Sequence, residues 1–334
     1  MTLSRVQENE PLVRLGGASV VYKVKTGLLS SKGLRAVDGV ELSIGSGRIM
    51  ALVGESACGK TTLGRLSLGL VRPTQGSLFF KGIDVWKMDE EQFRAFRRSA
   101  QIVHQDPYAS LNPYKTVRDI LGAPVRHYKL AKGRVEIDRF VSGYLGDMGL
   151  SPPEEYLGKY PFELSGGQRQ RVAIARAMIP GPEYIVADEP VTMLDASLRI
   201  GILEILRRLS ETKHLSILFI THDLLIANYL ARNQQIAVMY LGEIVEFGKG
   251  GEVISDPLHP YTRALVSASP EPDPKKTRSK KILELKKVDP PDPANPPKGC
   301  KFNDRCPYVF DRCLEERPRL REAAARHFVA CHLL

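Results

Sequence analysis

The stretch Gly54-Glu55-Ser56-Ala57-Cys58-Gly59-Lys60-Thr61 decides the fold, because it joins an apolar run to a helical segment through a glycine-rich turn. The run before it, residues 49–53, has the length and composition of a buried strand. The sequence therefore has the P-loop pattern in the strand–turn–helix context that this pattern requires. Glycines let backbone N–H groups surround phosphate oxygens, and the helix N-terminus adds partial positive charge. We expect Lys60 to reach the terminal phosphates and the Thr61 hydroxyl to bind Mg²⁺. The expected nucleotide contacts are Gly54, Glu55, Ser56, Ala57, Cys58, Gly59, Lys60, Thr61 and Thr62.

Length and composition limit the number of domains and the classes of protein to which this chain can belong. The chain has 334 residues, enough for one large domain or two ordinary ones, and 43% of them are hydrophobic. No run of 18 apolar residues occurs, so no membrane-spanning helix is expected. Residues 1–15 lack an apolar core and do not resemble a secretory signal. The net charge of +10 permits binding to nucleic acid or to anionic lipid and does not choose between them.

The order of elements predicts an α/β protein. Residues 11–24 and 34–53 are rich in strand-forming residues, and the alternation in 20–24 and 40–44 predicts half-exposed antiparallel strands. Gly45-Ser46-Gly47 predicts a hairpin into the P-loop strand. Apolar residues at helical spacing predict that residues 116–180 are largely helical. Tyr22 could stack on a nucleotide base or pack against neighbouring strand residues, and the sequence favours neither.

Polar side chains follow the ends of further predicted strands. Asp188 and Glu189 come after a near-continuous apolar run, and His222 comes after another. In open α/β sheets ligands bind outside the carboxyl ends of the strands. We expect Asp188 and Gln105 to hold Mg²⁺, Glu189 to polarise the attacking water, and His222 to contact the γ-phosphate. Each of these residues alone is weak support for a catalytic site. Together with a P-loop they predict phosphoryl-transfer catalysis by positioning and charge neutralisation.

The segment Leu164-Ser165-Gly166-Gly167-Gln168 opens a predicted helix over residues 169–178, with Ser165 as its N-cap. A helix N-terminus with two glycines is a second potential anion site. With the P-loop, the Asp188-Glu189 strand and His222, this segment makes residues 11–255 similar to ATP-binding cassette (ABC) ATPases.

The resemblance implies a P-loop NTPase fold: a RecA-like core sheet, an antiparallel β subdomain and a helical subdomain at about residues 106–180. It implies ATP and Mg²⁺ as cofactors and a head-to-tail dimer, in which Ser165, Gly166, Gly167 and Gln168 contact the nucleotide held by the other cassette. Ala57 departs from a glycine common at its position, and we expect it to fit if its φ is negative. A soluble ABC ATPase acting on nucleic acid or ribosomes is the alternative. A non-catalytic regulatory cassette is disfavoured by Glu189 and His222.

Four further segments are similar to the oligopeptide/dipeptide importer ATPases, and within them residues 106–113 resemble the second of the two paired ATPase subunits. They are residues 36–40, 103–113, 259–262 and 306–308. The resemblance implies a peripheral subunit on the cytoplasmic face of the membrane that couples ATP hydrolysis to uptake. Its implied partners are a second ABC ATPase subunit in a heterodimer or homodimer, two transmembrane permease subunits and, indirectly, an extracytoplasmic solute-binding protein, with no nucleic acid expected. Peptide, nickel or oligosaccharide is the solute in this group, and substrate choice lies in other subunits.

The sequence predicts three segments: a nucleotide-binding domain over 1–255, a Pro/Lys-rich linker over 256–298, and a small cysteine-rich C-terminal extension over 299–334. Basic residues at 275–281 predict a solvated stretch. The extension carries Cys300, Cys306, Cys313 and Cys331 in the spacing C-x₅-C-x₆-C-x₁₇-C, which matches neither the tight pairs of zinc sites nor common iron–sulfur runs. By resemblance, some relatives with this tail hold a [4Fe–4S] cluster on four such cysteines. Zinc, a disulfide pair or four reduced thiols remain alternatives.

Overall fold

A computed structural model of the protein describes residues 10–25, 31–269 and 282–334. The basic stretch predicted at 275–281 lies outside the described residues. The chain divides into two compact units, which are described separately: Met1–Gly45, Ile49–Lys87 and Phe219–Leu334 form the first, and Ser46–Arg48 with Met88–Leu218 form the second.

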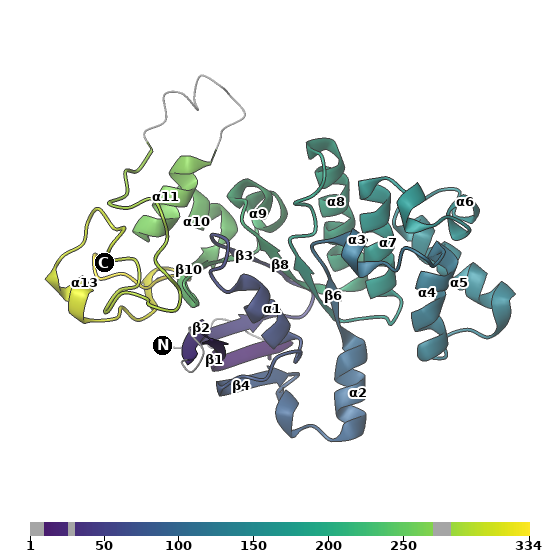
Figure 1. The fold of residues 1–334 in the computed structure, drawn as a ribbon, viewed down its shortest axis with the longest axis horizontal. Helices are drawn as coiled ribbons and strands as arrows, with labels where there is room; N and C mark the ends of the chain where they lie inside the picture. Colours follow the sequence, from purple (N-terminus) through teal and green to yellow (C-terminus); the bar gives the residue numbers. More distant parts are fainter. Residues whose placement is uncertain (1–9, 26–30, 270–281) are drawn as a thin grey trace. The chain divides into compact units, whose positions relative to one another are not determined.

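The first unit contains a four-stranded sheet near the N-terminus (Figure 1). Its order is β2-β1-β4-β5, made by β1 (Val13–Lys25), β2 (Ser31–Ile44), β4 (Gln75–Phe80) and β5 (Ile83–Asp84). All three pairings are antiparallel. Alternate residues such as Val13 and Leu15 are buried while Arg14 between them is more exposed, which is the period-two pattern of a half-buried strand. The predicted antiparallel strands are confirmed.

The P-loop strand β3 (Ile49–Val53) is buried at all five positions. It pairs parallel with β9 (Gln235–Tyr240), which forms an antiparallel hairpin with β10 (Glu243–Lys249). The hairpin predicted at residues 45–47 is wrong, because β2 and β3 belong to different sheets. A glycine-rich turn shows that the chain reverses direction, but it does not show which strand becomes the neighbour.

The C-terminal residues extend the sheet of the first unit. Strand β12 (His327–Val329) pairs with β10, and β11 (Arg321–Ala324) pairs with β12. Figure 1 shows this yellow segment beside β10. The ring of Phe302 is 1% exposed and lies edge-on to Tyr240, with the two ring centroids 5.2 Å apart. The tail thus shares its core with the strands that carry the P-loop. The helices of this unit are α1 (Lys60–Ser67), α9 (Leu224–Ala231), α10 (Gly250–Ser255), α11 (Pro260–Ala268) and α13 (Asp311–Glu315), with the short 3₁₀ turn η2 (Val85–Lys87).

The second unit is mainly helical, as the sequence predicts for residues 116–180. Its strand β6 (Ala100–Val103) pairs parallel with β7 (Tyr184–Asp188), which is buried throughout. Strand β8 (Ser216–Thr221) contains the boundary between the units. The helical elements are α2 (Glu90–Ser99), α3 (Pro107–Ser110), α4 (Val117–His127), α5 (Gly133–Asp147), α6 (Glu154–Leu157), η3 (Pro161–Glu163), α7 (Gly166–Met178) and α8 (Ala196–Lys213).

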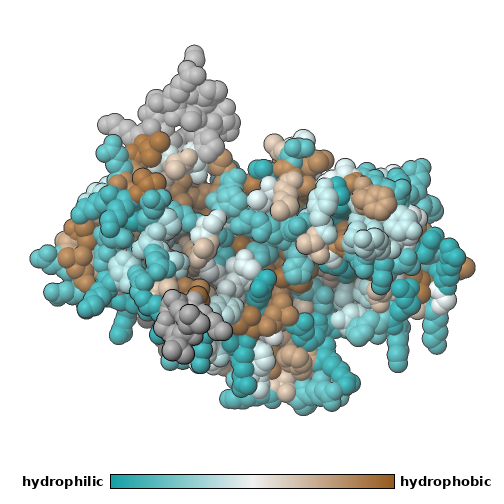
Figure 2. Space-filling view, viewed as in Figure 1, coloured by the Kyte–Doolittle hydropathy of each residue, from teal (hydrophilic) through white to brown (hydrophobic). Residues whose placement is uncertain are grey.

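The exposed surface has no large apolar belt on the face that Figure 2 shows, where hydrophobic side chains occur in small groups among hydrophilic ones. Within the residues that the structure describes, no helix has the length and apolarity needed to cross a membrane.

Candidate functional site

The P-loop connects β3 to α1 by a backbone path that requires glycine at two positions. A Cβ on Gly54 would lie 2.2 Å from the carbonyl oxygen of Met239, and one on Gly59 would lie 2.0 Å from that of Ala36. Gly59 also has φ of 109°, which side chains with a Cβ rarely adopt. Backbone from neighbouring strands therefore supports the loop closely, and only glycine fits at these contacts.

Lys60 begins helix α1 and is 5% exposed. Its ammonium donates hydrogen bonds to the carbonyl oxygens of Gly54 and Glu55, each at 2.8 Å. Cys58 is also buried, and burial raises the pKa of its thiol. The Lys60 ammonium is thus held at the loop by the loop's own carbonyls, while Cys58 is in its neutral form.

Ala57 has φ of 62°, in the left-handed region. The condition under which alanine was expected to fit, a negative φ, is therefore not met. The loop requires this turn conformation even without glycine, and the cost for an L-residue with a Cβ is about 1–2 kcal/mol.

Glu55 is fixed by groups from beyond residue 260. Its backbone N–H donates to the Tyr261 hydroxyl at 2.8 Å. Its carboxylate accepts two hydrogen bonds from the Arg305 guanidinium, at 2.8 and 2.9 Å. Sequence reasoning missed both contacts. Tyr261 lies within one of the segments that carried the family resemblance, whereas no pattern in the sequence pointed to Arg305.

In the second unit, two predicted catalytic residues meet. The Gln105 amide donates to the Glu189 carboxylate at 3.3 Å, and the Thr192 hydroxyl donates to the same oxygen at 3.1 Å. Glu189 follows β7 with φ of 45°, a conformation that costs of order 1–3 kcal/mol and occurs most often at functional sites. Asp188 ends β7 and is 7% exposed. The carboxylate predicted to act on water is thus oriented by two donors.

The segment predicted as a second anion site forms the capped start of α7. The Gln168 N–H donates to the Ser165 hydroxyl, and the Gln168 side chain accepts from the Ser165 N–H at 2.9 Å. This capping box confirms Ser165 as the N-cap. Ser165 is exposed, and Gly166 is partly exposed. The helix N-terminus is therefore accessible to an anion from outside the unit.

The predicted site residues fall into two groups. The P-loop, Tyr22 and His222 belong to the first unit, whereas Gln105, residues 165–168, Asp188 and Glu189 belong to the second. His222 is exposed directly after β8, and Tyr22 is 37% exposed on β1. Stacking of Tyr22 on a base and contact of His222 with a γ-phosphate stay predictions.

The four C-terminal cysteines are free thiols, and three of them are buried. Burial, with smaller contributions from Cys306, Cys313 and Cys331, raises the pKa of Cys300 to about 12. Among the residues that the structure describes, however, no group of three or more His, Cys, Asp or Glu side chains is arranged to hold a metal ion. The structure therefore gives the predicted [4Fe–4S] cluster no support.

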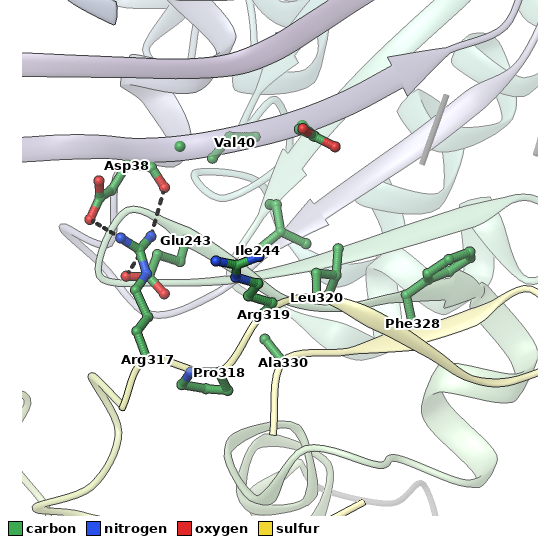
Figure 3. Close-up of a pocket in the computed structure, with 12 residues that line it drawn as sticks. Asp38, Val40, Glu243, Ile244, Arg317, Pro318, Arg319, Leu320, Phe328 and Ala330 are labelled. Atoms are coloured by element: carbon green, nitrogen blue, oxygen red, sulfur yellow. Dashed lines mark hydrogen bonds and ion pairs between the residues drawn. The ribbon is translucent and has the colours of Figure 1, made fainter. Parts of the chain in front are cut away.

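A cavity of about 690 Å³ in the first unit is lined by Asp38, Glu243 and Arg317 (Figure 3). Arg317 contacts Asp38 at 3.1 Å and Glu243 at 2.9 Å, and Lys301 contacts both carboxylates at 2.8 and 2.7 Å. Burial raises the pKa of Glu243. Burial also acts to raise the pKa of Asp38, but the hydrogen bonds and charges of Lys301, Arg317 and Arg35 together outweigh it and lower that pKa. Two cations of the C-terminal segment, Lys301 and Arg317, thus face two carboxylates, so this cluster joins that segment to β2 and β10.

Comparison with protein families gives two matches. The profile of the ABC transporter family matches residues 37–192, and that of the oligopeptide/dipeptide transporter C-terminal region matches residues 245–313.

Similar proteins match over nearly the full chain. The oligopeptide transport ATP-binding protein AppF of Bacillus subtilis is 42% identical over 97% of this chain and 98% of its own length. The oligopeptide transport protein OppF of Escherichia coli is 41% identical over 96% and 95%, and the dipeptide transport protein DppF of Haemophilus influenzae is 41% identical over 98% of both.

Among solved structures, a dimeric ATP-binding cassette in a post-hydrolysis state with ADP and Pi is 28% identical. Its TM-score is 0.62, and the match covers 71% of this chain and 98% of that one. The cbiO1 protein of Clostridium perfringens, part of an ABC transporter complex, is 24% identical with a TM-score of 0.63, covers 74% of this chain and 92% of that one, and shows the fold alone.

Proposed function

The chain belongs to the ABC transporter family of ATP-binding proteins, and from this membership we propose that it is the ATP-hydrolysing subunit of a peptide importer. Relatives named for oligopeptide and dipeptide transport match it over 95–98% of their length, so the similarity includes the C-terminal region as well as the cassette. Nothing in the comparisons favours the alternative of an ATPase that acts on nucleic acid.

The geometry at Glu189 carries the catalytic part of the proposal. Two donors hold this carboxylate after the end of β7, and its backbone is in a strained conformation. A carboxylate in such a position can accept a proton from water as it attacks a phosphoryl group. The Gln105 amide and the Thr192 hydroxyl orient it for that role.

The residues proposed to hold MgATP have suitable chemistry. Thr61, Gln105 and Asp188 offer the oxygen donors that Mg²⁺ prefers, and the ion would neutralise charge on the phosphates. Lys60 is a cation at the loop that would contact the terminal phosphates, and His222 would contact the γ-phosphate. Tyr22 is proposed as a contact for the base.

We further propose a two-chain assembly. The exposed, capped N-terminus of α7 offers unpaired backbone N–H groups and partial positive charge to an anion. One cassette would hold ATP on its P-loop, and the signature residues 165–168 of a second cassette, from a sibling subunit or another copy, would cover it.

The remaining partners and the location follow from family membership as proposals. Two permease subunits and a solute-binding protein would complete the importer, with this chain on the cytoplasmic face of the membrane. Peptides are the proposed solute, because the relatives' names refer to oligopeptide and dipeptide transport.

Uptake in cells tests this function. Deletion of the gene for this chain should abolish uptake of a labelled di- or oligopeptide, and the wild-type gene should restore it, whereas a Glu189→Gln variant should not. If the deletion leaves peptide uptake unaffected but abolishes uptake of nickel or of an oligosaccharide, that solute takes the place of peptides in the proposal. ATPase stimulation by RNA or DNA bound tightly at physiological salt would instead favour the nucleic-acid alternative.

We also propose the division of this chain into segments 1–255, 256–298 and 299–334. A separate proposal is that the four cysteines of the last segment hold a [4Fe–4S] cluster. The support for the cluster is the resemblance of the tail to relatives that hold one on four such cysteines, and the support for the segments is the change in composition along the chain. Iron and acid-labile sulfide analysis of anaerobically purified protein tests for the cluster, and absence of both would exclude it.

A further inference from the structure

The C-terminal segment reaches the P-loop through one residue, Glu55. Tyr261 accepts a hydrogen bond from its backbone N–H, and Arg305 binds its carboxylate with two hydrogen bonds. Both partners lie more than 200 positions away in the sequence. Glu55 is therefore fixed at its main chain and at its side chain, which is stronger control than either contact alone.

Arg305 is buried and held beside Glu55 by several hydrogen bonds. Its side chain is 3% exposed, and each of its three nitrogens donates a hydrogen bond. Besides Glu55, the acceptors are the carbonyl oxygens of Lys287 and Val288 and the Tyr240 hydroxyl. A planar fork with this many fixed acceptors has little freedom to leave Glu55.

The charge of Glu55 explains why such a contact matters. Glu55 stands in a loop whose other groups are suited to phosphate, and an unpaired carboxylate there would repel the phosphates of a nucleotide. Arg305 neutralises that carboxylate, and Arg305 and Tyr261 together hold Glu55 in one conformation.

The position of Glu55 also affects Lys60, the lysine expected to contact the phosphates. Lys60 donates to the carbonyl oxygen of Glu55 at 2.8 Å, so the position of Glu55 helps to set that of the ammonium. We propose that Arg305 and Tyr261 are positioning residues for nucleotide binding, which act through Glu55 on the P-loop and make the C-terminal segment part of the ATP site. This inference rests on the proposed function, because it assumes that the loop binds ATP.

The test is a charge-rescue experiment on the full chain, with equilibrium binding of Mg·ADP as the measurement. Binding by the wild type comes first, since its absence would reject the proposed function itself. Arg305→Gln should raise the Kd roughly tenfold, because it leaves Glu55 charged beside the phosphates. The double variant Glu55→Gln/Arg305→Gln should recover most of the lost affinity. Arg305→Lys should lose less than Arg305→Gln, since it keeps the charge.

Arg317→Gln is the matched control, because it removes a C-terminal arginine whose carboxylate partners, Asp38 and Glu243, lie outside the loop (Figure 3). Its Kd should stay within about twofold of the wild type. A folded Arg305→Gln protein with wild-type affinity would overturn the inference. Failure of Glu55→Gln to rescue would also overturn it, since a purely structural role for Arg305 does not depend on the charge of Glu55.

If Arg305→Gln does not fold, the affinity of a Tyr261→Phe variant for Mg·ADP tests the inference instead. This change removes only the hydroxyl that accepts the Glu55 N–H and keeps the buried ring. Its Kd for Mg·ADP should rise roughly threefold, as expected for one lost hydrogen bond. Wild-type affinity in this variant would contradict the inference.

Discussion

The Gln105 side-chain amide donates a hydrogen bond to the Glu189 carboxylate at 3.3 Å, joining the residue that follows β6 to the one that follows β7. These strands run parallel, so their carboxyl ends meet at one edge of the sheet. This strand arrangement explains why two residues 84 positions apart in the sequence are in contact.

Replacement of Glu189 by Gln should stop hydrolysis without stopping binding. Glutamine keeps the shape and can still contact Gln105 and Thr192, but it cannot accept a proton from water. We expect the ATPase rate to fall by about 10² or more, while the Kd for Mg·ATP changes little. Steady-state phosphate release and equilibrium binding measure the two effects. Glu211→Gln, on the exposed face of α8, is the control and should retain full turnover, and a Glu189→Gln protein as active as the control would remove Glu189 from catalysis.

Replacement of Gln105 by Glu should reduce turnover by a different route. It puts a second carboxylate where the amide now donates at 3.3 Å, and two like charges at that separation resist joint ionisation. We expect a lower rate at pH 7 that partly recovers as the pH rises. Gln101→Glu adds the same charge on β6, where the amide contacts the Arg97 carbonyl instead, and should leave the pH–rate profile as in the wild type. Equal profiles for the two variants would show that the Gln105–Glu189 contact has no part in the rate.

Replacement of Ala57 by Gly should stabilise the protein. The left-handed φ of 62° costs an alanine about 1–2 kcal/mol. Glycine removes that cost but loses about 0.4–1 kcal/mol through greater freedom in the unfolded chain. The first effect is at least as large as the second, so we expect a gain of up to about 1.6 kcal/mol, measured by denaturant unfolding. Ala196→Gly, in the exposed first turn of α8, should lose up to about 1 kcal/mol. The opposite signs make this pair informative, and a loss at both positions would mean that the loop conformation costs alanine little.

Local patterns in the sequence predicted local structure well. The apolar run at 49–53, the glycine-rich turn and the Ser165 cap each act through neighbours within a few residues, and the structure contains β3, the loop and the capping box. The alternation in residues 11–24 likewise indicated β1. In each case the physical cause lies within the stretch that was read.

The failures share a different cause. The turn at 45–47 could not show that β3 pairs with β9, because the partner residues, such as Gln235 for Met50, lie far along the chain. The φ of Ala57 is imposed by the loop and not by alanine's own preference. Arg305 and Tyr261 reach Glu55 only after the C-terminal segment packs on the first unit. Long-range ion pairs leave no periodic pattern in a single sequence, so these contacts could not be predicted from it.

His259 should make stability depend on pH below neutrality. It caps α11 by accepting the Tyr261 N–H on Nδ1 at 3.0 Å, and it is 2% exposed. Burial lowers the pKa of His259 from 6.5 to about 4, although Glu246 nearby opposes the shift. Between these values the unfolded chain binds a proton that the native protein does not, so native stability falls as the pH drops from about 6.5 to about 4. The loss is on the order of 3 kcal/mol.

The variant His259→Asn isolates this effect. Asparagine can still accept the Tyr261 N–H as an N-cap but does not titrate. The free energy of unfolding, measured by denaturant titration from pH 4 to pH 8, should fall less steeply in the variant than in the wild type below pH 6.5. At pH 8, above both pKa values, the two proteins should differ only by the constant cost of the substitution. Parallel curves across the whole range would show that His259 is protonated as readily in the folded protein as in the unfolded chain.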